Sequence, residues 1–84
     1  MEVNNTIIFD SKELSKQAVK DILFEVYDAL EERGYDPIVQ IVGYLVSGDV
    51  GYISNHLEAR KKIQKLDREQ ILEVLLDNYL NIDK

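Results

Sequence analysis

The sequence predicts an all-α fold: a small bundle of about four to five helices with a flexible N-terminal arm, forming a homodimer. Apolar residues recur at helical spacing in several segments, and glycines or helix-opening polar residues separate those segments. A chain of 84 residues makes one domain with a thin stability margin, which pairing with a second copy would increase. We place the arm at residues 1–14 and a single helical domain at residues 15–84.

The arm contains polar residues around a short β-prone run, residues 6–9. Four such residues without a partner strand do not hold a sheet, so we expect a mobile segment. Taken alone, Thr6 is an ordinary polar residue, although a hydroxyl on such an arm is accessible to a kinase.

The first helix is predicted from about Lys16 to Glu32, with Ser15 or Ser11 as its cap. One buried stripe follows the i, i+3, i+4 spacing: Val19, Ile22, Leu23, Val26 and Leu30. Gly34 supplies the left-handed residue that ends this helix.

The second helix, residues 37–47, begins with Asp36 as the cap and Pro37 at the first helical position. It is apolar on almost all sides, so it is either the central helix of the fold or covered on one face by another chain. Gly43 and Ser47 lie one turn apart and would let another backbone come near. The predicted residues of a dimer interface or close helix packing are Val39, Val42, Gly43, Val46 and Ser47.

A third helix is predicted from about His56 to Lys65, opened by a capping box of Asn55 and Glu58. A last helix follows Asp67 and ends near Leu80. Its predicted core face consists of Ile71, Leu72, Leu75, Leu76, Tyr79 and Leu80.

Composition excludes several function classes. Sixteen acidic residues against ten basic ones give a net charge of −6, which argues against a general nucleic-acid binder or an anionic-membrane binder. Without cysteine and with a single histidine, no thiolate or His-rich metal site is expected. We expect no catalytic residues, no metal and no cofactor, and therefore no enzyme. With no signal peptide and no apolar run of roughly 18 residues, a cytoplasmic protein without membrane insertion is predicted.

Two features leave alternatives open. The basic cluster Arg60, Lys61, Lys62 and Lys65 is either a solvated helix face or a docking surface for a phosphate or an acidic partner. The stretch 40–63 also resembles a helix-turn-helix, in which Ser54, Asn55 and Arg60 would face the major groove. The turn glycine falls one residue late for that motif, and the net charge of −6 does not suit DNA. A small DNA-binding protein is therefore only the alternative function.

The middle of the chain resembles the IreB family of small regulatory phosphoproteins from Gram-positive bacteria. The resemblance covers roughly residues 17–80 and departs from the family at Val50 and Ser54, where the family usually has proline, and at Asn55, where it has arginine. Its central residues are Arg33-Gly34-Tyr35-Asp36-Pro37-Ile38, Gln40-Ile41-Val42-Gly43-Tyr44-Leu45 and Ser47-Gly48-Asp49.

The resemblance implies a helical homodimer without known catalysis. It implies a substrate and effector of a membrane-anchored serine/threonine kinase with extracellular PASTA repeats, in a pathway that responds to cell-envelope stress. The partners would be that kinase and its phosphatase. The family is phosphorylated on threonines of the N-terminal arm, and only Thr6 matches here, since the other position falls near Val3.

Overall fold

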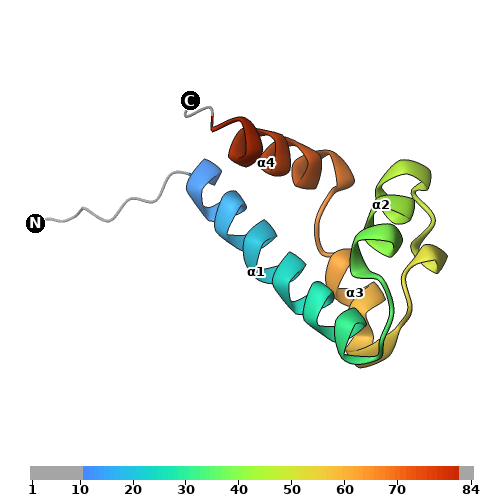
Figure 1. Ribbon diagram of the computed structural model, residues 1–84. Helices are drawn as coiled ribbons and strands as arrows, with labels where there is room; N and C mark the ends of the chain where they lie inside the picture. Colours follow the sequence, from blue (N-terminus) through green and yellow to red (C-terminus); the bar gives the residue numbers. More distant parts are fainter. Residues whose placement is uncertain (1–10, 82–84) are drawn as a thin grey trace, which may run out of the picture.

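The computed structural model describes residues 11–81, and Figure 1 shows that they form helices joined by short turns. No strand occurs within this range, so the predicted all-α fold is confirmed. The elements are α1 (Ser11–Glu32), α2 (Pro37–Ser47), the 3-10 turns η2 (Val50–Tyr52) and η3 (His56–Glu58), α3 (Ala59–Ile63) and α4 (Arg68–Leu80).

Helix α1 is the longest element, and α2, α3 and α4 all contact it. Its predicted stripe is confirmed, because Val19, Val26 and Leu30 are fully buried and Ile22 and Leu23 pack against them. The remaining elements therefore share one apolar support.

The start of α1 differs from the prediction. The helix begins at Ser11 rather than near Lys16, so residues 11–14 belong to the helix and not to the arm. Lysine, glutamate and leucine, which follow Ser11, have good helix propensity and extend the helix beyond its buried stripe. Thr6 lies outside the described residues.

The link between α1 and α2 forms as predicted. Gly34 adopts a left-handed φ of 83°, and its N–H donates to the Glu31 carbonyl at 2.9 Å. Asp36 caps α2, since its Oδ1 accepts the Val39 N–H at 3.3 Å. Both devices satisfy backbone groups that a helix end leaves unpaired.

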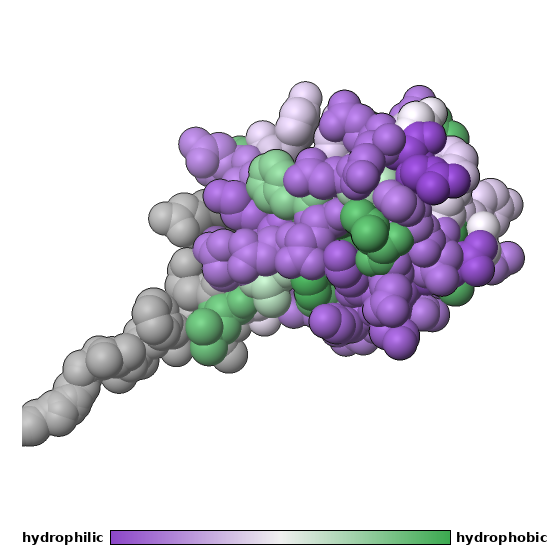
Figure 2. Space-filling model, turned by 90° about the horizontal axis from the view of Figure 1, so that it is seen from below, coloured by the Kyte–Doolittle hydropathy of each residue, from purple (hydrophilic) through white to green (hydrophobic). Residues whose placement is uncertain are grey.

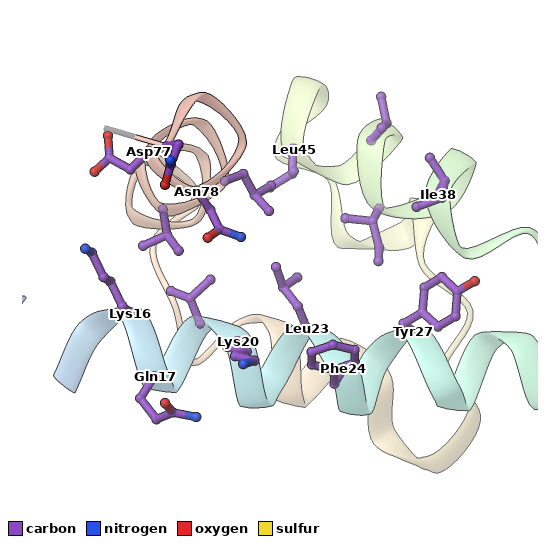
Figure 3. A pocket seen from close by; sticks show the side chains of 16 residues that line it. Lys16, Gln17, Lys20, Leu23, Phe24, Tyr27, Ile38, Leu45, Asp77 and Asn78 are labelled. Atoms are coloured by element: carbon purple, nitrogen blue, oxygen red, sulfur yellow. The ribbon is translucent and has the colours of Figure 1, made fainter. Parts of the chain in front are cut away.

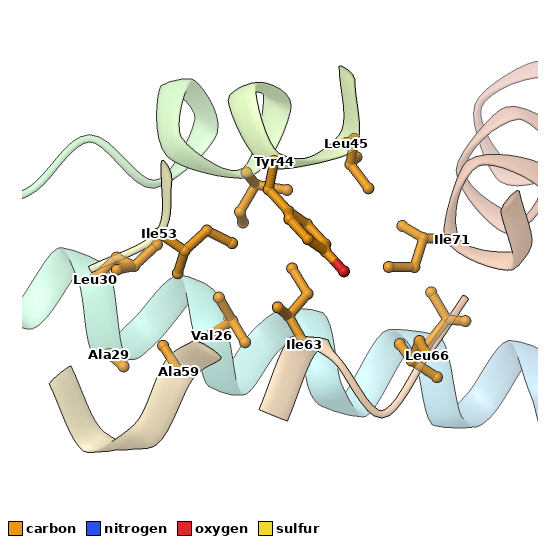
Figure 4. Packing of buried hydrophobic residues seen from close by; sticks show 12 residues of the cluster. Val26, Ala29, Leu30, Tyr44, Leu45, Ile53, Ala59, Ile63, Leu66 and Ile71 are labelled. Atoms are coloured by element: carbon orange, nitrogen blue, oxygen red, sulfur yellow. The ribbon is translucent and has the colours of Figure 1, made fainter. Parts of the chain in front are cut away.

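Helix α2 buries one face against the core and leaves the other exposed. Tyr44 and Leu45 point from α2 toward α1, α3 and α4 (Figure 4). The interpretation of α2 as a fully enclosed central helix is therefore wrong for the single chain. The buried apolar core comprises Val19, Val26, Ala29, Leu30, Ile41, Tyr44, Leu45, Ile53, Ala59, Ile63, Leu66 and Ile71.

The close neighbour of Gly43 is a side chain and not a second backbone. A Cβ placed on Gly43 would lie 2.7 Å from Cδ1 of Tyr52, because the η2 turn brings that ring over α2. Ser47 serves the same connection, since its hydroxyl donates to the Gly43 carbonyl at 2.7 Å and accepts the Asp49 N–H at 2.9 Å. The prediction of a close helix crossing at Gly43 is therefore wrong for the described part of the single chain, where a tyrosine ring occupies that position.

The predicted third helix is broken. Leu57 and Glu58 have φ values of 54° and 61°, so residues 56–58 form a separate turn and α3 starts only at Ala59. The expected capping box does not form. Asn55 Oδ1 accepts the N–H of Arg60 at 3.3 Å instead. The break at residues 57 and 58 limits α3 to five residues.

The apolar stripe of α4 is mostly exposed, contrary to the prediction. Only Ile71 is fully buried, and Val74 packs partly against the core. Leu72, Leu75, Leu76, Tyr79 and Leu80 are exposed. The surface is not apolar on every side, because the face shown in Figure 2 is mostly hydrophilic, with small separate apolar patches.

The contact between Gly43 and Tyr52 should control the effect of Gly43→Ala. Alanine favours a helix over glycine by about 1 kcal/mol, but its Cβ would collide with the Tyr52 ring. We expect Gly43→Ala to destabilise the protein alone and to be clearly less destabilising in a Tyr52→Ala background, where only the Cβ of residue 52, 3.3 Å from the new methyl group, still crowds it. Urea unfolding of the four variants at one protein concentration measures this coupling, and equal effects in both backgrounds would contradict it.

Candidate interaction site

An apolar groove with a volume of about 680 Å³ opens between α1, α2 and α4. Leu23 of α1 and Leu45 of α2 point into it (Figure 3). Tyr27 and Ile38 lie at one end of the groove, and Lys16 lies at the other. A groove of this size, lined mainly by apolar side chains, is suited to binding a ligand or a peptide segment.

Helical periodicity explains which residues line the groove. Lys16, Lys20 and Phe24 are spaced four residues apart, so they share one side of α1. Helix α4 is anchored in the core by Ile71 near its start, and its later residues Leu75 and Asn78 form the facing wall. Residues of α2, Ile41, Val42 and Leu45 among them, line the side of the groove between α1 and α4.

A second candidate surface is the outer face of α2. Val39, Val42 and Val46 are 64%, 51% and 79% exposed, so they are uncovered in the single chain, and Val42 also lines the groove. Gly43 and Ser47 do not belong to this exposed row. The Tyr52 ring lies against Gly43, and the Ser47 hydroxyl forms hydrogen bonds with Gly43 and Asp49. Three of the five predicted interface residues therefore form an outward apolar row.

The predicted basic docking cluster is partly used within the chain. Arg60 Nε donates to the Ile53 carbonyl at 2.6 Å, which ties α3 to the preceding connection. Lys62 Nζ lies 3.6 Å from Glu25 Oε1 of α1. Lys61 and Lys65 are exposed. Two of the four residues are thus engaged within the chain, and Lys61 and Lys65 remain exposed to solvent.

The local geometry does not favour the helix-turn-helix alternative. Ser54 forms two hydrogen bonds with the Gln40 side chain, at 2.9 Å through its N–H and 3.2 Å through its hydroxyl. Arg60 is engaged by Ile53, and α3 has only five residues, too few for a recognition helix that lies in a major groove. The residues proposed to read bases instead hold the loop together.

His56 packs at the end of α1. Its Nε2 lies 3.6 Å from Glu32 Oε1 and is buried without a hydrogen-bond partner. The strained residues Leu57 and Glu58 follow directly, so this corner joins η3 to α1. His56 is therefore a packing residue at this corner.

The described part of the chain contains neither a cluster of metal-binding side chains nor a helix suited to span a membrane. Within residues 11–81, no three His, Asp or Glu side chains are placed to hold a metal ion. None of the helices in this range has both the length and the hydropathy to cross a bilayer.

Sequence analysis did not identify the groove. Its walls come from three helices that lie far apart in the sequence, and each wall follows a pattern that also suits a buried core. The sequence contained one indication of such a surface: its helices carry more apolar residues than a domain of 84 residues can bury.

Arg60 should behave as a structural residue and Lys61 as a surface residue. Arg60→Ala removes a charged hydrogen bond to a backbone carbonyl and should cost about 1.5 kcal/mol of stability. Lys61→Ala, its neighbour, should change stability by less than about 0.5 kcal/mol. Chemical denaturation compares the two, and equal effects would contradict the assignment.

Comparison with known proteins places the chain in a family. The family model described as "IreB regulatory phosphoprotein" matches residues 4–81, which include the whole helical body. A UPF0297 protein from Acetivibrio thermocellus is 46% identical over 80 residues, covering 95% of this chain and 89% of that relative. Both matches extend across α1, α2, α3 and α4 together with the groove between them. The chain therefore belongs to the IreB family of regulatory phosphoproteins.

Proposed function

We propose that this regulatory phosphoprotein is a non-enzymatic substrate and effector of a PASTA-type serine/threonine kinase, in a cytoplasmic pathway linked to cell-envelope stress. The observation that carries the proposal is the family match over residues 4–81, which includes Thr6 as well as the helical body. The kinase and its phosphatase would set the phosphorylation state, and the apolar surfaces of the body would bind the partner that responds to it.

Thr6 is the proposed phosphoacceptor. It is the only threonine in the chain and lies five residues before the start of α1. A phosphate there adds nearly two negative charges to a chain of net charge −6, so its position relative to nearby lysines matters. Phosphorylation would act by changing where the N-terminal segment binds and which surface a partner can reach.

The outer face of α2 is the proposed homodimer interface. Val39, Val42 and Val46 form an exposed apolar row on an eleven-residue helix, and exposed apolar patches on soluble proteins commonly mark association sites. Pairing would also bury surface that a small domain cannot enclose alone.

Thr6 phosphorylation can be tested by intact-mass analysis after incubation with a PASTA-type kinase domain and ATP. We expect one added phosphoryl group on the wild type and none on Thr6→Ala, because threonine occurs nowhere else in the chain. Ser15→Ala is the matched control, since it removes a nearby hydroxyl from α1 and should leave the added mass unchanged. Phosphorylation that persists in Thr6→Ala would move the acceptor to a serine.

The dimer proposal can be tested by light scattering of Val46→Lys. Val46 is mostly exposed in the single chain, so lysine should preserve the monomer fold while placing a charge in the α2 interface. We expect the wild type to give the mass of a dimer and Val46→Lys the mass of a monomer.

Tyr79→Lys provides the control for the dimer test. Tyr79 is also strongly exposed, but it lies on α4 and should leave the dimer intact. Dissociation by Tyr79→Lys with an intact Val46→Lys dimer would place the interface on α4 instead.

A further inference from the structure

The groove between α1, α2 and α4 exposes apolar side chains that its own helices leave uncovered. Phe24, Ile38 and Leu75 line it and are each 40% or more exposed, above buried residues such as Val19 and Leu45. Removing such side chains from water stabilises a folded protein by about 25 cal/mol per Å² of apolar surface. An apolar peptide segment is therefore a favourable occupant.

The charge at one end of the groove suits an anion. Lys16 and Lys20 line this side on α1, and Asp77 of α4 lies opposite (Figure 3). Two ammonium groups against one carboxylate leave this end positive on a chain whose net charge is −6. A phosphate, with nearly two negative charges, is attracted by this excess of one positive charge among the lining residues.

The N-terminal ten residues supply both an apolar run and the phosphate. Ile7, Ile8 and Phe9 directly follow Thr6, and Val3 lies further toward the N-terminus. This segment enters α1 at Ser11, next to the end of the groove that carries Lys16. Because it is tethered there, its effective concentration at the groove is in the range of about millimolar for short linkers.

The length of the segment fits the spacing of the lysines. Thr6 precedes Ser11 by five residues, so it reaches at most about 17 Å when the chain is extended. Lys16 and Lys20 lie about 7.5 Å and about 13.5 Å along α1 from Ser11. A segment that turns back along α1 therefore brings Thr6 level with these two lysines. Residues 7–9 would then cover the end of the groove near Lys16, since Ile7 reaches at most about 14 Å from Ser11. Met1 and Val3 are the apolar residues that can extend to Phe24, which lies about 19.5 Å along α1 from Ser11.

We propose that the groove binds this chain's own N-terminal segment, residues 1–10, and that Lys16 and Lys20 bind the phosphate on Thr6. Phosphorylation then strengthens docking and covers apolar surface that a partner would otherwise reach. This inference rests on the proposed function, because that function supplies the phosphate. The outer face of α2, with Val39 and Val46, stays available to a second copy.

The chain has no cysteine, so a single spin label can report on docking. Asn4→Cys carries the label, and phosphothreonine is incorporated at position 6 during translation, which makes the experiment independent of any kinase. We expect the label to cause loss of the Val42 and Leu75 amide NMR signals relative to that of Lys62 on α3. This loss should be greater with phosphothreonine than with threonine, and should diminish at high salt.

Two charge-removing variants locate the phosphate. Lys16→Gln with Lys20→Gln should return the phosphorylated chain to the signal loss of the unphosphorylated one. Lys61→Gln with Lys65→Gln removes the same charge from the α3 region and should have no effect. Both lysine pairs lie four residues apart, so the comparison tests position and not net charge.

Three results would overturn the proposal. These are equal signals at Val42, Leu75 and Lys62 in both phosphorylation states, signal loss concentrated on α3, or sensitivity to the Lys61 and Lys65 pair alone.

Mixing spin-labelled chain with isotope-labelled chain that carries no spin label shows whether the groove binds the chain's own segment or that of a second copy. Loss seen only within one chain supports the proposal, whereas loss seen between chains assigns the groove to a second copy. Failure of the kinase to modify Thr6 would instead remove the proposed function and leave this docking result standing.

Discussion

The buried stripe of α1 is the surface on which the rest of the structure depends. Val19, Val26 and Leu30 are fully enclosed, and α2, α3 and α4 each reach the core by packing against this helix. When several short elements share one support, each needs to bury only the side that faces it. The opposite sides of α2 and α4 therefore remain exposed, although both helices are rich in apolar residues.

This arrangement relates the architecture to regulation. A small domain encloses only part of its apolar surface, and much of the remainder here lies in the groove, along the outer row of α2 and on the exposed side of α4. Surfaces of this kind bind proteins or peptide segments. A covalent charge near such a groove can change its occupancy without altering the fold, which is the behaviour we propose for this chain.

Sequence patterns predicted part of the apolar surface that the fold leaves exposed. The almost wholly apolar second helix indicated an uncovered face, and Val39, Val42 and Val46 do lie outward. The role of Gly43 could not be predicted, because its neighbour Tyr52 approaches through a turn whose path depends on packing. The basic cluster was also divided by tertiary contacts, since Arg60 binds a carbonyl that only the folded loop brings near.

The all-α class and the buried stripe of α1 could be predicted from the sequence through apolar periodicity, and the junction at Gly34 and Asp36 through helix-end signals within a few residues. The family could also be recognised from the sequence, through residues distributed over the whole helical body. The folded structure was needed to establish which apolar faces are buried, where the third helix breaks and where the groove opens. These features depend on how segments that are distant in the sequence pack on the limited surface of α1. Periodicity within one segment does not show which of its apolar residues will pack there.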